Sequence, residues 1–171
     1  MLIFGPGASG KSTLARRLGE ITGLRVIELD KVFWEPGLVE TPRDRWVRDQ
    51  QELVEVNGWI LDGDLGPYDA IEVRLRAADT IVFLDFVLLR CAWRAIWRSR
   101  ERLDFWFGLF RYRRHSRPLL VKSIATEAPS AAIHVLRNPE AVRRFVADVV
   151  RAHPAQAHDR PVWRNTRSTW R

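Results

Sequence analysis

The chain contains, near its start, a loop whose residue types and spacing suit phosphate binding. Residues 5–12 have the sequence GPGASGKS, which fits the pattern G-x-x-x-x-G-K-[ST] at each fixed position. An apolar stretch at residues 1–4 predicts a buried strand before the loop, and an amphipathic helix is expected after it. Backbone N–H groups in such a loop, together with the positive end of a helix dipole, favour polyphosphate. The pattern therefore predicts a phosphate-binding loop.

The side chains of this loop can be given individual roles on the same chemistry. Lys11 is expected to reach the β- and γ-phosphates of a nucleotide, and the Ser12 hydroxyl is expected to coordinate Mg²⁺. Arg137, which follows the last expected strand, is a candidate contact for the nucleotide base. The remaining candidate phosphate contacts are Gly5, Gly7, Ala8, Ser9, Gly10 and Thr13.

Three aspartates, Asp30, Asp62 and Asp85, each follow an expected strand. In a parallel sheet covered by helices the ligand lies outside the carboxyl ends of the strands, so these acids are expected to meet the phosphate loop at one edge. Asp62 is the candidate acid for Mg²⁺ and Asp85 is the alternative. Asp30 is a candidate for binding a hydroxyl acceptor or removing its proton. Two simpler interpretations stay open: Asp62-Gly63 is also a common turn pair, and Asp30 could only cap the loop after it.

Arginines recur at four-residue intervals between Arg90 and Arg102, which on a helix forms a ridge of guanidinium groups. Arg94 and Arg98 are candidate catalytic residues that would neutralise charge during phosphoryl transfer, and a solvated helix face is the alternative. Residues 98–122 mix aromatic and basic side chains. That composition suits a mobile lid, a nucleic-acid surface or an interfacial membrane helix, and it does not decide among them.

The elements that must position these residues alternate along the chain. Strands are expected at 1–4, 25–29, 59–61, 80–84 and 131–136, and helices at 12–22, 41–56, 70–77, 87–102 and 138–153. Alternating strands and helices, with several strands apolar throughout, predict an α/β fold of three layers in which helices cover both faces of a parallel sheet. We expect one domain over residues 1–153 and a mobile basic tail over 154–171.

Composition narrows the class of protein. The 171 residues are 46% hydrophobic, which suits one domain with a sizeable core. A single cysteine, Cys91, excludes an internal disulfide and favours a reducing compartment, for which we expect the cytoplasm. No signal-peptide pattern and no run of eighteen apolar residues occurs, so secretion and membrane spanning are disfavoured. The net charge of +7 and the pI near 10.6 favour anionic partners such as nucleotides and nucleic acid.

The motifs together resemble a known group of proteins. The phosphate loop, the Leu29-Asp30 strand end with Trp34 soon after, the turn at residues 60–64 and the strand at 81–85 with arginines downstream resemble adenylate-kinase-like P-loop proteins, most closely the subgroup labelled DNA topology modulation (FlaR-related) proteins. The resemblance covers residues 1–150. It implies a five-stranded parallel sheet of the nucleoside-monophosphate-kinase type, a basic lid after the fourth strand, and ATP and Mg²⁺ as ligands. The residues it implies are Gly10, Lys11 and Ser12 for phosphate and metal, Asp62 for the acid of the Asp-Gly turn, and Arg94 and Arg98 at the base of the lid.

The chain departs from this group on the acceptor side. Residues 65–68 are Leu-Gly-Pro-Tyr, where adenylate kinases have a Phe-Pro-Arg sequence whose arginine holds the acceptor phosphate. The Gly-Gly-Gly motif of shikimate kinases is also absent, and Asp64 stands where the subgroup usually has Asn. We expect a phosphotransferase that moves the γ-phosphoryl group of ATP to a small acceptor, such as a nucleotide or nucleoside. The alternatives are an ATP-dependent nucleic-acid-associated protein and a nucleotide-binding protein without turnover.

Overall fold

The computed structural model describes residues 1–63, 65, 69–86 and 116–154. The expected helix at 87–102 with Arg94 and Arg98, the expected lid residues 98–115 and the tail from residue 155 lie outside these described residues. In chain order the elements are β1 (Leu2–Phe4), α1 (Lys11–Thr22), β2 (Arg25–Glu28), α2 (Leu29–Phe33), β3 (Trp34–Glu35), β4 (Val39–Glu40), α3 (Arg43–Glu55), β5 (Trp59–Asp62), α4 (Ile71–Arg76), β6 (Thr80–Leu84), α7 (Arg117–Glu127), β7 (Ala132–Leu136) and α8 (Pro139–Ala152).

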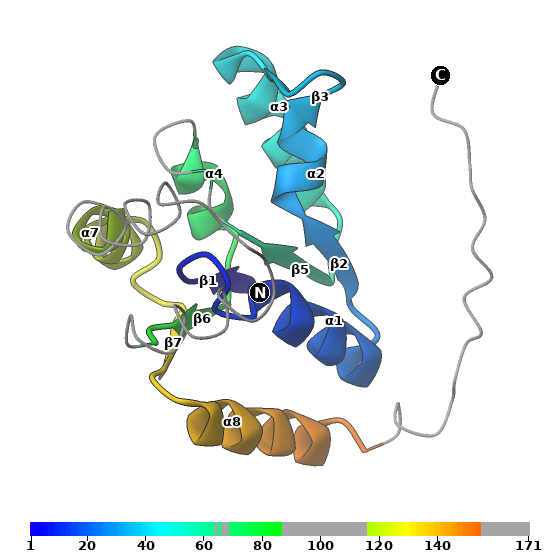
Figure 1. The fold of residues 1–171 in the computed structure, drawn as a ribbon, viewed down its shortest axis with the longest axis vertical. Coiled ribbons are helices and arrows are strands. Elements are labelled where there is room, and N and C mark those ends of the chain that lie inside the picture. The colour runs from blue at the N-terminus through cyan, green and yellow to red at the C-terminus, as the bar shows by residue number, and fades with distance from the viewer. Residues whose placement is uncertain (64, 66–68, 87–115, 155–171) are drawn as a thin grey trace, which may run out of the picture.

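Five parallel strands form one sheet in the order β2-β5-β1-β6-β7 (Figure 1). β1 lies at the centre, where Ile3 is in register with Asp62 of β5 on one side and with Val82 of β6 on the other. The loop that follows β1 therefore leaves the sheet between the carboxyl ends of β5 and β6. This arrangement confirms the predicted α/β fold with a five-stranded parallel sheet and brings the expected acids to the edge at which the phosphate loop begins.

Helices cover both faces of the sheet because side chains alternate along each strand. Leu2 and Phe4 of β1 point into a core that includes buried residues of α2, α3, α4 and α7. Ile3, between them, points to the opposite face, where it packs with buried residues of α1 and α8. Figure 1 shows α1 and α8 on one side of the sheet and α4 and α7 on the other. The central strand β1 and residues 81–84 of β6 are apolar and buried because both of their faces are covered.

Two helix ends behave as their sequences predict. Gly23 ends α1 in the left-handed conformation with φ 71°, and its N–H donates to the Gly19 carbonyl. Asn138 precedes α8 and its side-chain oxygen accepts a hydrogen bond of 2.8 Å from the Ala141 N–H, with Pro139 as the first helical residue. Such caps satisfy backbone groups that a helix leaves unpaired.

Local expectations between β2 and β5 need correction. The Thr41-Pro42 pair is a typical helix start, with the threonine as cap and the proline as first helical residue. Pro42 instead occupies the cap position of α3, and the Thr41 hydroxyl donates to the Phe33 carbonyl. Asp30 lies within the short helix α2 rather than in a loop. The Pro-Gly sequence at residues 36–37 favours turns, and the structure adds to them the antiparallel hairpin β3–β4 over residues 34–40. The hairpin was missed because its strands are two residues each, which is too short for an alternating pattern.

The described end of the expected lid is also different from the expectation. Residues 117–122 begin α7, whose side chains Leu120 and Ile124 are buried in the core beside α4. Leu119 and Val121 in the same helix are exposed, so its apolar residues lie on both the buried and the exposed face. The sequence therefore lacks the amphipathic pattern that would identify a helix packed on the core. Among the described residues, no helix is long and apolar enough to cross a bilayer.

Candidate phosphate and magnesium site

The loop after β1 is pressed against the end of β6. Gly5 has a φ of 153°, and a Cβ atom on it would lie 2.8 Å from the Leu84 carbonyl oxygen and 2.9 Å from the Leu84 Cβ. No larger side chain fits there without moving the backbone of the sheet. Ala8 and Gly10 also have positive φ, of 57° and 97°, so the loop curls back toward the start of α1. Its shape is therefore set by backbone conformations that glycine readily adopts.

Lys11 lies at the junction of this loop and α1. Its Nζ donates hydrogen bonds of 2.8 Å to the Gly5 carbonyl and 3.1 Å to the Pro6 carbonyl, so the ammonium group is held inside the loop. The first turn of α1 leaves backbone N–H groups without intrahelical partners on the same side. Beside them, the buried Ser9 hydroxyl has no hydrogen-bond partner among the described residues. The loop thus concentrates donors and positive charge where a phosphate would bind.

Asp62 is the last residue of β5 and is only 4% exposed. Its Oδ1 atom has no hydrogen-bond partner in the described part of the chain. Burial raises the pKa of Asp62; the Ser12 hydroxyl and the charge of Lys11 oppose the rise, and the charge of Asp30 adds to it. The structure therefore brings together the predicted residues Lys11, Ser12, Asp62 and Asp30 at one edge of the sheet. A carboxylate oxygen and a hydroxyl are suitable ligands for Mg²⁺, which keeps several waters and uses few protein ligands.

Asp85 differs from Asp62 in its partners. Arg117 donates from Nε to Oδ1 at 3.2 Å and from Nη2 to Oδ2 at 2.9 Å, a bidentate contact that occupies both carboxylate oxygens. The Asp85 side chain is 10% exposed. Of the two candidate acids, Asp62 is therefore the one with an oxygen available to a metal ion, which favours it for that role.

Asp30 is exposed on α2, two residues after the end of β2. Its neighbour Lys31 pairs with Glu28 at 3.0 Å rather than with Asp30. The carboxylate of Asp30 is thus accessible to a small molecule that approaches the edge of the sheet next to Asp62. Within the described ranges, no group of three or more His, Cys, Asp or Glu side chains is arranged to hold a metal ion.

A pocket of about 390 Å³ opens next to the phosphate loop. It lies between α1 and α8, the two helices that share one face of the sheet, and most of its lining is apolar. Arg17 and Arg143 are the charged residues of its lining. The residues that line it are Ala8, Ser9, Gly10, Thr13, Leu14, Arg17, Leu84, Phe86, Pro139, Val142, Arg143 and Val146. A pocket of this size and character is suited to a planar organic group attached to the phosphates.

Sequence reasoning did not identify this pocket. Leu14 and Val142 belong to the apolar stripes of ordinary amphipathic helices, and nothing in their local sequence marks them as ligand contacts. The available signal was topological, because α1 and α8 were expected to cover a sheet whose central strand carries the loop. Arg137, the predicted base contact, is exposed and is not among the lining residues, so its role stays a prediction.

Of the segment of aromatic and basic residues at 98–122, the structure describes only residues 116–122. Arg117 contacts Asp85 and lies 5.9 Å from the centre of the Phe83 ring, and Lys122 is exposed on α7. The arginines on which a nucleic-acid interaction would depend, at positions 111, 113 and 114, lie outside the described residues. Nucleic-acid binding therefore stays a prediction from sequence, as do the catalytic roles of Arg94 and Arg98.

Solved structures with a similar fold are small-molecule kinases. The chain is similar to a shikimate kinase from Acinetobacter baumannii in complex with shikimate, with a TM-score of 0.62 and 17% identity over 92% of this chain and 94% of that one. It is also similar to a sugar kinase from Janibacter sp. HTCC2649, with a TM-score of 0.54 and 23% identity over 92% and 97% of the two chains. A gluconokinase from Sinorhizobium meliloti 1021 matches with a TM-score of 0.51 and 18% identity over 90% and 92%.

These similarities concern the fold. At identities below 25% they show that the chain has the P-loop fold of the nucleoside-monophosphate-kinase type, and they assign no substrate. No protein-family model matches the sequence, and no curated protein matches it.

Proposed function

We propose that this chain is a kinase that transfers the γ-phosphoryl group of ATP to a small hydroxyl-bearing acceptor. The observation that carries the proposal is the buried Asp62 carboxylate beside Ser12 and Lys11, whose Oδ1 has no hydrogen-bond partner among the described residues. A buried carboxylate oxygen without a partner is unfavourable in a folded protein unless a ligand supplies one. A Mg²⁺ ion that accompanies a nucleotide would be such a ligand.

Different residues of the site would bind the phosphates, the metal ion and the base of the nucleotide. The backbone N–H groups of residues 8–13 and the ammonium of Lys11 would hold the phosphates, and Ser12 with Asp62 would hold Mg²⁺. When bound, the metal supplies neutralisation of phosphate charge. Lys11 would leave the Gly5 and Pro6 carbonyls for the phosphates, since a phosphate oxygen is the stronger acceptor. The pocket between α1 and α8 would take the adenine.

The acceptor would bind on the other side of the phosphate loop, where β2 and β5 end. Asp30 would accept a hydrogen bond from the acceptor hydroxyl and take its proton as the phosphoryl group transfers. Arg94 and Arg98, carried by the segment after β6, would neutralise charge on the transferring group. These roles rest on the sequence pattern and on the proximity of Asp30 to Asp62.

Two arguments favour two different classes of acceptor. The resemblance of the sequence to adenylate-kinase-like proteins, and within them to the DNA topology modulation (FlaR-related) subgroup, favours a nucleotide or nucleoside, and we propose membership of that group on its motifs. The similar structures are named as kinases of sugar, shikimate and gluconate, which favours a hydroxylated metabolite. Both classes belong in the test. The single cysteine supports a cytoplasmic location for such an enzyme.

Coupled measurement of ADP release, with a panel of nucleoside monophosphates, nucleosides, sugars and hydroxy acids, tests the proposal. We expect one class to stimulate release and Lys11→Ala to abolish it with the fold intact, because the substitution removes the ammonium group that the loop holds where the phosphates would bind. Lys122→Ala, which removes an exposed lysine on α7, is the matched control and should retain full activity.

Two results would contradict the proposal. Full activity in Lys11→Ala would remove the loop from catalysis. Binding of Mg²⁺ and ATP without stimulated ADP release from any acceptor in the panel would instead indicate a nucleotide-binding protein without turnover.

A further inference from the structure

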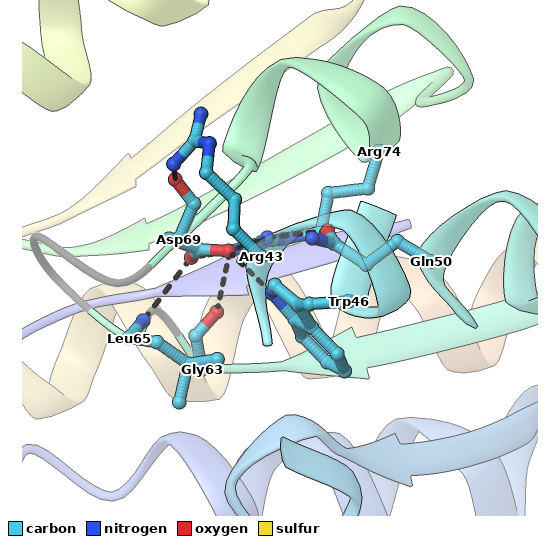
Figure 2. A network of polar contacts seen from close by, with 7 residues as sticks. All are labelled: Arg43, Trp46, Gln50, Gly63, Leu65, Asp69 and Arg74. Carbon is cyan, nitrogen blue, oxygen red and sulfur yellow. Dashed lines mark hydrogen bonds and ion pairs between the residues drawn. The ribbon is translucent and has the colours of Figure 1, made fainter. Parts of the chain in front are cut away.

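A buried ion pair between Asp69 and Arg74 lies beneath the turn that follows Asp62 (Figure 2). Arg74 comes from α4 and its side chain is fully buried, while the Asp69 side chain is 4% exposed. The guanidinium donates from Nη1 to Oδ1 at 2.6 Å and from Nη2 to Oδ2 at 2.5 Å. We name this bidentate pair the Asp69–Arg74 clamp. Neither the phosphate loop nor the proposed acceptor residue Asp30 makes these contacts, so the clamp is separate from the site described above.

The clamp binds the backbone of the two described residues that follow Asp62, Gly63 and Leu65. Arg74 Nη2 donates to the Gly63 carbonyl at 3.3 Å, and the Leu65 N–H donates to Asp69 Oδ2 at 3.1 Å. The Gly63 N–H in turn donates to the Ile3 carbonyl of β1 at 3.2 Å. The described backbone at 63 and 65 is therefore tied to the clamp on one side and to the central strand on the other.

The same pair reaches the stem of the phosphate loop and the neighbouring helix. The Arg74 guanidinium carbon lies 5.6 Å from the centre of the Phe4 ring, and Phe4 is the residue before the loop begins. From α3, the Gln50 side-chain oxygen accepts from Arg74 Nη1 at 2.8 Å and the Trp46 indole N–H donates to Asp69 Oδ1 at 3.4 Å. One pair thus connects the ends of β1 and β5 with α3 and α4.

Stability alone does not account for this arrangement. A buried ion pair loses the hydration of both charges, and replacing such pairs with apolar side chains of similar volume is often neutral or stabilising. Here Arg74 Nε and Gln50 Nε2 are buried without partners among the described residues, which adds to the unfavourable balance. What the pair provides is direction, because a planar guanidinium and a carboxylate fix each other's orientation through two parallel hydrogen bonds.

We propose that the Asp69–Arg74 clamp is a positioning device that holds the turn after Asp62 so that the Asp62 carboxylate faces Ser12 and Lys11. The inference rests on the proposed function, because it concerns the residues that would hold Mg²⁺ there. Arg74 and Asp69 touch neither phosphate nor metal and act through the backbone of Gly63 and Leu65. Groups that orient a metal ligand in this way commonly change metal affinity when they are removed.

Two variants separate positioning from folding. Arg74→Lys keeps the charge but cannot contact both carboxylate oxygens and the Gly63 carbonyl together. The double variant Asp69→Leu/Arg74→Met removes both charges, leaves no buried ion unpaired and is expected to stay folded. Arg76→Lys is the matched control, because Arg76 lies on the same helix in an exposed ion pair with Glu127 at 2.7 Å, away from the turn.

Calorimetric titration of ADP, with Mg²⁺ and with EDTA, measures the metal contribution without any acceptor. Titration of Mn²⁺ into the ADP complex, followed by electron paramagnetic resonance, measures metal affinity directly. We expect Arg74→Lys and the double variant to lose about 10- to 100-fold in metal affinity while ADP affinity in EDTA changes less than about twofold. Arg76→Lys should match the unmodified chain in both measurements.

The outcomes distinguish the two proposals. If the double variant is folded, as judged by its melting curve, and keeps the full metal affinity, the clamp does not position Asp62 and the inference is overturned. An equal loss of ADP affinity with and without metal would also overturn it, since that pattern indicates general damage to the loop. If the unmodified chain binds ADP equally with Mg²⁺ and with EDTA, the metal site in the proposed function is wrong, and the clamp's role falls with it.

Discussion

Replacing Asp62 with Asn is expected to stabilise the chain in the absence of nucleotide and to abolish its response to Mg²⁺. The two effects share one cause, because the same buried carboxylate is unfavourable without a metal ion and useful with one. Asp62 is 4% exposed and its Oδ1 has no partner in the described structure. Asn has nearly the same shape and carries no charge, so it removes the unfavourable burial without opening a cavity.

The size of the stabilisation follows from the surroundings of Asp62. A buried polar group without a partner is unfavourable by about 1–3 kcal/mol, and the Ser12 hydroxyl and Lys11 offset part of that here. A gain of about 1–2 kcal/mol corresponds to a rise in melting temperature of ~2–8 °C for a chain of this length. Such opposition between stability and function is common at binding sites.

The gain depends on pH in a defined direction. Burial raises the pKa of Asp62 in the folded chain, so folding favours the protonated carboxyl. This contribution to stability is fully present below the ordinary aspartate pKa, roughly 3.9, and is lost as the pH rises through the raised value. The Asn variant has no such dependence. Its advantage over the unmodified chain should therefore be absent in acid, grow as the pH rises, and be complete at neutral pH.

Melting curves with and without ligand test both effects. At 100 times the dissociation constant a ligand stabilises by about 2.7 kcal/mol, or ~5–10 °C here, and in Asp62→Asn the shift with Mg²⁺ and ADP should equal the shift with ADP in EDTA. Asp85→Asn is the matched control: it breaks the contact with Arg117, so it should lower the melting temperature and keep the Mg²⁺ response. A lower melting temperature for Asp62→Asn at neutral pH, or a retained Mg²⁺ response, would refute the reasoning.

Two further substitutions test the loop and the pocket. Gly5→Ala should destabilise the chain by about 2–4 kcal/mol in chemical denaturation, because its Cβ would meet the Leu84 carbonyl at a strained φ, whereas Gly7→Ala at an exposed position should have little effect. Val142→Trp should fill the pocket and weaken ATP binding at least tenfold in calorimetry while leaving tripolyphosphate binding unchanged, and Val150→Trp on the exposed side of the same helix should leave both unchanged. Equal effects of the two tryptophans would count against a base pocket between α1 and α8.

The elements of the fold that could be predicted are those marked by a pattern of a few neighbouring residues. The apolar strands, the glycines and lysine of the loop, and the Asn-Pro start of α8 each carry their own evidence within a few residues. The convergence of Lys11, Ser12, Asp62 and Asp30 was also predictable, because parallel strands place their carboxyl ends along one edge. Features that depend on packing were missed. The helix α7, the hairpin β3–β4 and the pocket between α1 and α8 have no distinctive local pattern.

Arg74 illustrates why packing features escape a reading of the sequence. Its segment, Ile71–Arg76, lies within the short helix expected over residues 70–77, and that expectation treats its two arginines alike. In the structure Arg76 is exposed, whereas Arg74 is fully buried. The difference arises because Asp69, on the loop before the helix, supplies a buried counter-charge to one of them. That partnership is a property of the folded loop, and no spacing rule distinguishes the two arginines.

The pKa values of two buried aspartates, Asp62 and Asp69, are shifted in opposite directions. The difference bears on function. Burial alone would raise the pKa of Asp69, but the hydrogen bonds and charge of Arg74, with the Leu65 N–H and the Trp46 indole, lower it below its ordinary value. Burial raises the pKa of Asp62, seven positions earlier, and the Ser12 hydroxyl and the charge of Lys11 offset only part of that rise. The fold can therefore satisfy a buried carboxylate fully at this end of the sheet, whereas the described residues leave one oxygen of Asp62 without a hydrogen-bond partner. A ligand that brings positive charge to the phosphate loop is the simplest reason for that difference, and it is the reason why the Asn variant should be both more stable and unable to respond to metal.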